Sequence, residues 1–178
     1  MAVDHVKSTP VTNLDATPVV INTAGEGGPA PLKSISSGSV LGVASSSIDA
    51  TYQFVRVPSN AKLKNVFFRS AAQAAGTMDI GVYYATDGLG GRPTSLLVAA
   101  AISRTLIAAA VALTSASGQV DLLATATSTF TVAMQNQPLW QAAGLTSDPG
   151  GNFDIVGSLA AAITTGTGAM GMTVHYTD

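Results

Sequence analysis

The sequence predicts an all-β protein in which residues 51–178 form an antiparallel sandwich or barrel and residues 1–50 form an extended N-terminal arm. Several segments after residue 50 alternate apolar and polar residues with a period of two, which is typical of half-buried strands. Loops bearing Gly, Pro and Asp separate these segments at short spacing. Phe, Tyr and Trp occur only from Tyr52 onward, so the aromatic part of the core belongs to the second region.

The first fifty residues are rich in Ser, Gly, Pro and Thr. This composition favours an extended or irregular cover, with short β pieces at 17–21 and 39–43. The chain therefore divides at residue 50 into an arm and a β-domain.

The strands of the β-domain follow from local patterns. Segments 51–57 and 61–71 flank a Pro-Ser-Asn turn and are predicted as the two strands of a hairpin or a corner. Alternation predicts further strands at 77–84, 130–134, 153–163 and 169–176. The Ala-rich run 95–113 fits a helix or a buried strand. We favour a strand over 96–107 followed by looser chain, and the sequence leaves 108–118 open between strand, helix and loop.

One short helix is predicted near 138–143. Pro138 suits its first position, where the missing N–H is not needed, and Gly144 suits the left-handed position just past its end. We expect Trp140, the only tryptophan, to plug one end of the sandwich or to contact a neighbouring subunit. The turn sequence at 148–151 then directs the chain into the strand that contains Phe153.

The charge content narrows the possible functions. Only 10% of the residues are charged, against about 25% in an average globular protein. A surface made largely of Ala, Ser, Thr and Gly suits a protein whose faces meet other protein faces. The net charge of −2 gives no electrostatic basis for binding nucleic acid or an anionic membrane. Arg104 lies in the middle of the longest apolar run, which argues against a membrane span, and the N-terminal residues lack the apolar core of a signal peptide.

The residues needed for catalysis are scarce. The chain has two histidines, His5 and His175, and no cysteine, and no known catalytic motif appears. Asp148 and Asp154 could supply oxygens to calcium, but Asp-Pro-Gly-Gly is a turn sequence in its own right. The glycines of 87–93 are those of a strand-joining loop. We therefore predict no enzyme, no cofactor and no metal site.

Two sets of residues could bind a partner. Arg56, Lys62, Lys64 and Arg69 lie close together in the sequence, either as a solvated strand face that protects a sheet edge or as an electrostatic contact for an acidic partner. Trp140 is the other candidate contact. Tyr52 and Tyr83 could form a stacking platform for a sugar, as in carbohydrate-binding sandwiches.

Taken together, the stretches YQFVRVPSNAKLKNVFFRS, QPLWQAAGLTSDPGGNFDIVGSLAAAI and GAMGMTVHYT resemble a group of tailed-phage structural proteins, the capsid decoration or cement proteins. The resemblance covers roughly residues 50 to 178 and is most specific in the PLWQAAGL stretch. It implies a jelly-roll-like β-sandwich.

The same resemblance implies a function and a partner. A protein of this family would form homotrimers on the outer surface of the icosahedral capsid and clamp neighbouring major capsid subunits, with no nucleic acid or membrane as partner. The alternatives are a head–tail connector, a tail or fibre component, and a carbohydrate-binding module.

Overall fold

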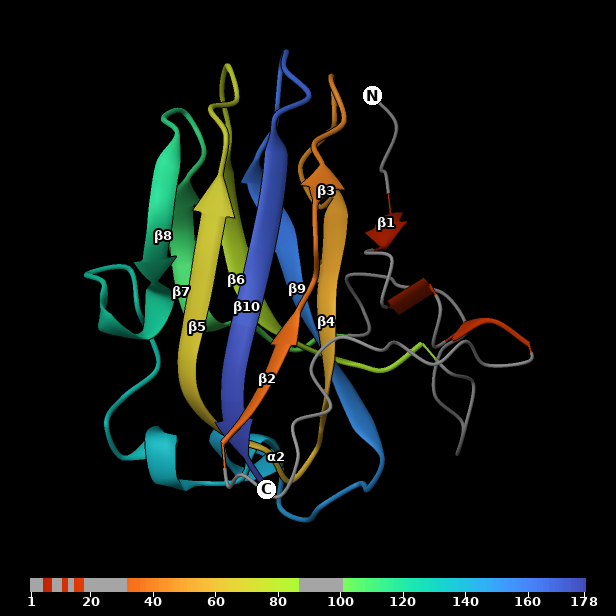
Figure 1. Ribbon diagram of the computed structural model, residues 1–178, viewed down its shortest axis with the longest axis vertical. Coiled ribbons are helices and arrows are strands. Elements are labelled where there is room, and N and C mark those ends of the chain that lie inside the picture. Colours follow the sequence, from red (N-terminus) through yellow and green to blue (C-terminus); the bar gives the residue numbers. More distant parts are fainter. Residues whose placement is uncertain (1–4, 8–10, 13–14, 18–31, 87–100) are drawn as a thin grey trace.

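The computed structural model describes residues 5–7, 11–12, 15–17, 32–86 and 101–178, and their strands form two sheets (Figure 1). Sheet A has the order β1-β4-β9-β6-β7, with strands β1 (His5–Lys7), β4 (Thr51–Pro58), β9 (Asn152–Ala161), β6 (Thr77–Tyr84) and β7 (Ala101–Ala112). Sheet B has the order β2-β10-β5-β8, with strands β2 (Lys33–Ser36), β10 (Ala169–Thr177), β5 (Lys62–Ser70) and β8 (Ser117–Asp121); β3 (Val40–Leu41) also pairs with β10. Apart from the parallel β1·β4 pair, these pairings are antiparallel, which confirms the all-β antiparallel sandwich.

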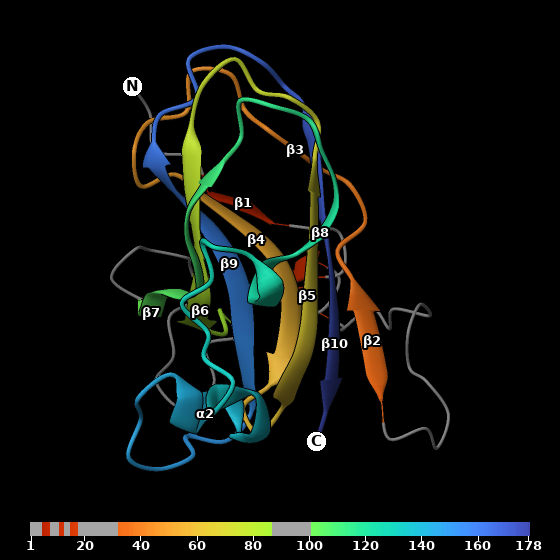
Figure 2. The ribbon, with the colours of Figure 1, turned by 90° about the vertical axis from the view of Figure 1, so that its left-hand side faces the viewer.

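The two sheets face each other and enclose the core (Figure 2). The predicted alternation in the later strands is confirmed, because the buried inward residues of β6, β9 and β10 are Met78, Ile80, Val82, Phe153, Ile155, Leu159, Met170, Met172 and Val174. Phe54 and Phe68 meet edge to face across the two sheets, with ring centroids 5.9 Å apart. Gly157 leaves room for this packing, since a Cβ there would lie 2.2 Å from the Met78 sulfur.

The Pro-Ser-Asn turn is a corner and not a hairpin. It links β4 of sheet A to β5 of sheet B, and Ala61 N donates to the Pro58 carbonyl across it (3.1 Å). Neighbouring residues in the sequence therefore lie on different sheets, which matters for the basic residues on either side of this corner.

The predicted short helix is confirmed as α2 (Leu139–Ala142), which lies at one end of the sandwich (Figure 2). It begins one residue later than expected, because Pro138 has an extended conformation and precedes the first helical residue. The first two helical N–H groups donate to the corner: Leu139 N to Ala61 O (2.8 Å) and Trp140 N to Ser59 O (3.0 Å). Gly144 has φ +84°, the left-handed conformation expected just past the helix.

The prediction of a strand at 130–134 is wrong. Phe130 is buried, but the backbone turns immediately after it, with Met134 N donating to Thr131 O (3.0 Å), and Val132 is 78% exposed. A 3-10 helix, η4 (Met134–Asn136), follows, and another, η3 (Leu122–Ala124), follows β8. Alternation over five residues does not make a strand where no neighbouring strand pairs with it.

The Ala-rich run is a strand where the structure describes it. Strand β7 extends to Ala112, so the looser chain expected after residue 107 is wrong, and β8 begins at Ser117. Residues 96–100 and the predicted loop at 87–93 lie outside the described residues. In the described part of the chain, no helix is long and apolar enough to span a membrane.

Among the described residues before position 50, three strands occur. The predicted β piece at 39–43 is confirmed as β3, whereas most of 17–21 lies outside the described residues. Strand β2 was not predicted, and both β2 and β3 pair with β10. The division of the chain at residue 50 stays a prediction, although β1, β2 and β3 are all hydrogen-bonded into the two sheets.

Candidate docking surface

Arg56 does not lie with the other predicted basic residues, because it stands on β4 of sheet A. Its side chain is 4% exposed and faces Asp154 of β9, which is 0% exposed. Nε donates to Asp154 Oδ1 at 2.6 Å and Nη2 to Oδ2 at 3.0 Å, while Nη1 donates to Asp15 at 2.7 Å. Burial opposes the charge, but hydrogen bonds to the two carboxylates outweigh it and raise the pKa of the Arg56 guanidinium.

This ion pair belongs to a polar network on the outer face of sheet A. Asp154 also accepts a hydrogen bond from Gln53 Nε2 and one from the Thr86 amide (3.3 Å). Burial raises the pKa of Asp154, and the hydrogen bond and charge of Arg56 act in the opposite direction. Asp15 joins the network to Lys7 through a 2.7 Å ion pair, so the network ties two parts of the N-terminal region to sheet A.

Asp148 and Asp154, the two aspartates that could supply oxygens to calcium, have different hydrogen-bond partners. Asp148 Oδ1 accepts from Ser59 Oγ (2.6 Å) and from the Gly150 amide (2.8 Å), which fixes the turn against the β4–β5 corner. Within the described ranges, no cluster of three or more His, Asp or Glu side chains could hold a metal ion.

Lys62, Lys64 and Arg69 share the outer face of sheet B. Leu63, Val66 and Phe68 of β5 are buried, whereas Lys62 and Arg69 are exposed and Lys64 is half-buried. A register shift against β10 near Asn65 accounts for the break in strict alternation along β5. The structure therefore brings three of the four predicted basic residues onto one strand.

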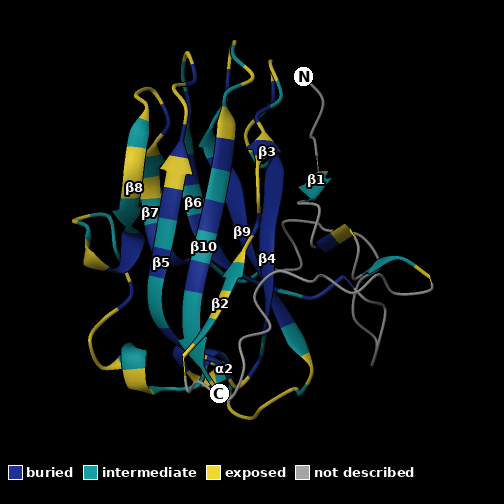
Figure 3. Ribbon diagram, viewed as in Figure 1, coloured by how far each residue is buried: buried dark blue, intermediate teal, exposed yellow. Residues whose placement is uncertain are grey.

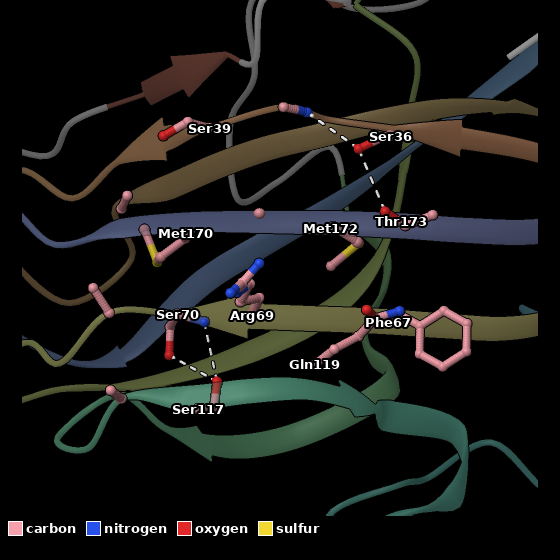
Figure 4. A pocket seen from close by; sticks show the side chains of 15 residues that line it. Ser36, Ser39, Phe67, Arg69, Ser70, Ser117, Gln119, Met170, Met172 and Thr173 are labelled. Carbon is pink, nitrogen blue, oxygen red and sulfur yellow. Dashed lines mark hydrogen bonds between the residues drawn. The ribbon is translucent and has the colours of Figure 1, made fainter. Parts of the chain in front are cut away.

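A shallow groove of about 640 Å³ lies on this face, between the edge formed by β2 and β3 and strand β8. Arg69 lies in the middle of the groove, between β10 and Ser117 of β8 (Figure 4). The rest of the lining is mostly small or hydroxyl-bearing residues, with Phe67 and the edges of Met170 and Met172: Ser36, Gly38, Ser39, Ser70, Ala71, Ala116, Ser117, Gln119, Ala169, Gly171 and Thr173.

The neighbours of Arg69 leave its guanidinium uncovered. Gly171 is its register partner on β10 and has no side chain to shield it. On the other side, Gly118 of β8 is exposed, and a Cβ built there would meet no atom within 4 Å. Sequence reasoning missed the glycine, serine and glutamine residues of the groove; the one available signal was Gly171 between two inward-facing methionines.

Trp140 is half-buried and packs against the main core, as expected for a plug at the end of the sandwich. Leu139 is the more deeply placed anchor, with 1% of its surface exposed. The predicted contact of Trp140 with another subunit stays a prediction.

The proposed sugar platform of Tyr52 and Tyr83 is wrong, because both residues are 0% exposed. Tyr52 lies in the main core, and its hydroxyl contacts the Val43 amide at 3.2 Å. Tyr83 packs with Val156 on the opposite face of sheet A, where burial raises the pKa of its phenol. Neither ring can stack on a ligand from solvent.

Comparisons with known proteins identify solved structures with a similar fold. No protein-family model and no curated protein sequence matches the chain. A chain of the capsid of Ralstonia phage GP4 is similar over 98% of both chains, with a TM-score of 0.56 and 13% sequence identity. A chain of the cyanophage Pam1 capsid asymmetric unit covers 91% of this chain and 95% of its own length, with a TM-score of 0.47 and 18% identity. The likeness to the GP4 chain shows that the two proteins share a fold along their whole length.

Proposed function

We propose that this protein is a non-catalytic structural component of a tailed-phage virion that decorates the capsid from its outer surface and stabilises it. The observation that carries the proposal is the fold likeness to a chain of the Ralstonia phage GP4 capsid, because it extends over 98% of both chains. The charge content of 10% supports a protein that works in an assembly.

The proposed partner is the major capsid protein, bound across neighbouring subunits by a homotrimer of this chain. Three copies of a modest contact act together once one is docked, since linkage raises the effective concentration of the others. A trimer therefore needs no single strong interface with the shell. This reasoning fits the outer face of sheet B, where the groove around Arg69 is lined mostly by small or hydroxyl-bearing residues.

Shells assembled from the major capsid protein encoded in the same genome test the proposal. Purified protein is added to these shells, and bound copies are located by electron cryomicroscopy while shell disassembly is followed during heating. We expect density at local three-fold positions over the whole shell and a higher disassembly temperature than for shells alone. A monomer that leaves shells unchanged in heat and low salt would refute the proposal, and density confined to one vertex would identify a connector instead.

A further inference from the structure

The Lys and Arg side chains in the described ranges divide into two groups by whether they form an ion pair. Outside β5, those in the described ranges form ion pairs: Lys7 with Asp15, Lys33 with Asp178, Arg56 with Asp154 and Asp15, and Arg104 with Asp49 and Asp79. Lys62, Lys64 and Arg69, all on the outer side of β5, form no ion pair with any residue that the structure describes. Among the described residues, Lys64 donates only to neutral oxygens, at Gln135 and Asn136.

We infer that the outer face of sheet B binds an extended acidic segment of a partner protein, and that Arg69 holds one end of this segment. The inference rests on the proposed function, since it names the chemistry by which a capsid subunit would meet this protein. Three positive charges on one face, without an ion-pair partner in the described part of the chain, provide the complementarity that guides such a contact and fixes its register.

The shape of the face fits an extended peptide. Lys62 and Arg69 are seven residues apart on one strand, a span of about 23 Å. An extended segment laid along β5 could reach all three cations with carboxylates on alternate residues. The groove around Arg69 adds the hydroxyl groups of Ser36 and Ser39, which can donate to carboxylate or backbone oxygens.

The acidic residues of sheet B do not compete for these cations. Asp121 of β8 accepts hydrogen bonds from Asn65 Nδ2 (2.7 Å) and from the Val66 and Leu123 amides. Asp178 pairs with Lys33 at 2.6 Å. The positive charge of β5 is therefore available to a ligand from outside.

The same bonds argue against a second copy of this chain as the occupant. Every aspartate in the described ranges already forms an ion pair or accepts a hydrogen bond: Asp15, Asp49, Asp79, Asp121, Asp148, Asp154 and Asp178. Nucleic acid is also disfavoured, because the net charge is −2 and phosphate backbones are held by many cations. A carboxylate-bearing segment of another protein is the occupant that these charges favour.

Peptide binding to the full-length protein tests the inference. The probes are a fluorescent peptide of alternating Asp and Ser, about ten residues long so that it spans the face when extended, and a matched peptide of Asn and Ser. We expect the acidic peptide to bind, the neutral one not to bind, and the affinity to fall as salt is added. Arg69→Gln should weaken binding about fivefold. Lys7→Gln removes the same charge from sheet A, where Lys7 pairs with Asp15, and should leave binding unchanged.

Several outcomes would overturn the inference: equal binding of the neutral peptide, no binding of the acidic one, or equal weakening by Lys7→Gln and Arg69→Gln. The inference would also be overturned if a single-stranded oligonucleotide bound more tightly than the acidic peptide. Concentration-dependent self-association that Arg69→Gln abolishes would overturn it as well. The shell assay separates this inference from the proposed function. Shell binding that Arg69→Gln does not weaken refutes only the docking face, whereas peptide binding without shell binding refutes only the capsid role.

Discussion

Replacing Arg56 by Gln should destabilise the whole sandwich, because it leaves a buried carboxylate without its counter-ion. Asp154 is 0% exposed and lies on β9, which pairs with both β4 and β6. The substitution removes the donors at 2.6 and 3.0 Å from its two oxygens and the donor at 2.7 Å from Asp15. Gln53 and the Thr86 amide remain as neutral donors to Asp154.

The magnitude follows from the burial of both partners. Removing one member of a buried ion pair costs about 3–5 kcal/mol, because the remaining charge stays desolvated. In a domain of this size, each kcal/mol lowers the melting temperature by roughly 2–4 °C, so we expect a decrease of about 6–20 °C. Replacing both partners, as in Arg56→Met with Asp154→Leu, should recover part of this loss but not all of it, since Gln53 and Thr86 would then lack their acceptor.

Thermal unfolding followed by circular dichroism measures this effect, with denaturant unfolding as a second measurement of the free energy. Lys33→Gln is the matched control, because it breaks an ion pair of 2.6 Å whose partners are 39% and 29% exposed. This control should not change the melting temperature measurably. If Arg56→Gln lowered the free energy of unfolding by less than about 1 kcal/mol, the reasoning from burial would be refuted.

Three further changes test other parts of the structure. Gly81→Ala should lower the free energy of unfolding by about 3 kcal/mol or more, because a Cβ there would lie 2.1 Å from the Ser103 carbonyl oxygen. Gly118→Ala places its Cβ in open space and should have little effect. Equal melting temperatures of the two variants would contradict this prediction. Trp140→Ala should lower the free energy of unfolding by about 1.5–2.5 kcal/mol, half the range for a fully buried aromatic residue. A lost oligomer with an unchanged melting temperature would instead assign Trp140 to an interface. Burial opposes ionisation of Asp15, but hydrogen bonds from Lys7 and Arg56 outweigh it and lower its pKa. The stabilisation from Asp15 is therefore present above its unfolded pKa of about 3.9 and is lost as the pH falls through the lower folded value. Hydrogen exchange of β1 should accelerate only in that acid range. Acceleration near neutral pH would contradict the role of Asp15 in holding β1.

The central strands could be predicted from sequence because burial and alternation coincide in them. Met170, Met172 and Val174 point inward on a strand whose other face is open, so the period of two is visible. Strands β2 and β8 were missed, because their short sequences, KSIS and SGQVD, contain few apolar residues. Backbone pairing with β10 and β5 holds them in place, and the local sequence does not report such pairing.

The candidate site could be predicted only in part, because nearness in the sequence was taken for nearness in space. The corner at residues 58–61 sends Arg56 to sheet A and the other three cations to sheet B. One feature of the sequence indicates that Arg56 does not belong with the other three cations. Asp154 lies on a strongly apolar strand, and a buried carboxylate requires a partner of opposite charge.

The unequal burial of the two sheets has a consequence for how the sequence can change. Residues 153–159 of β9 are all buried, and β4 is buried from Thr51 to Val57, whereas buried and partly exposed residues alternate along β10 (Figure 3). A saturation mutagenesis library should therefore tolerate almost no change along β9, but should accept changes at every second position of β10. We therefore expect the outward positions of β10 to accept new side chains, and with them new contacts, while β4 and β9 hold the fold constant.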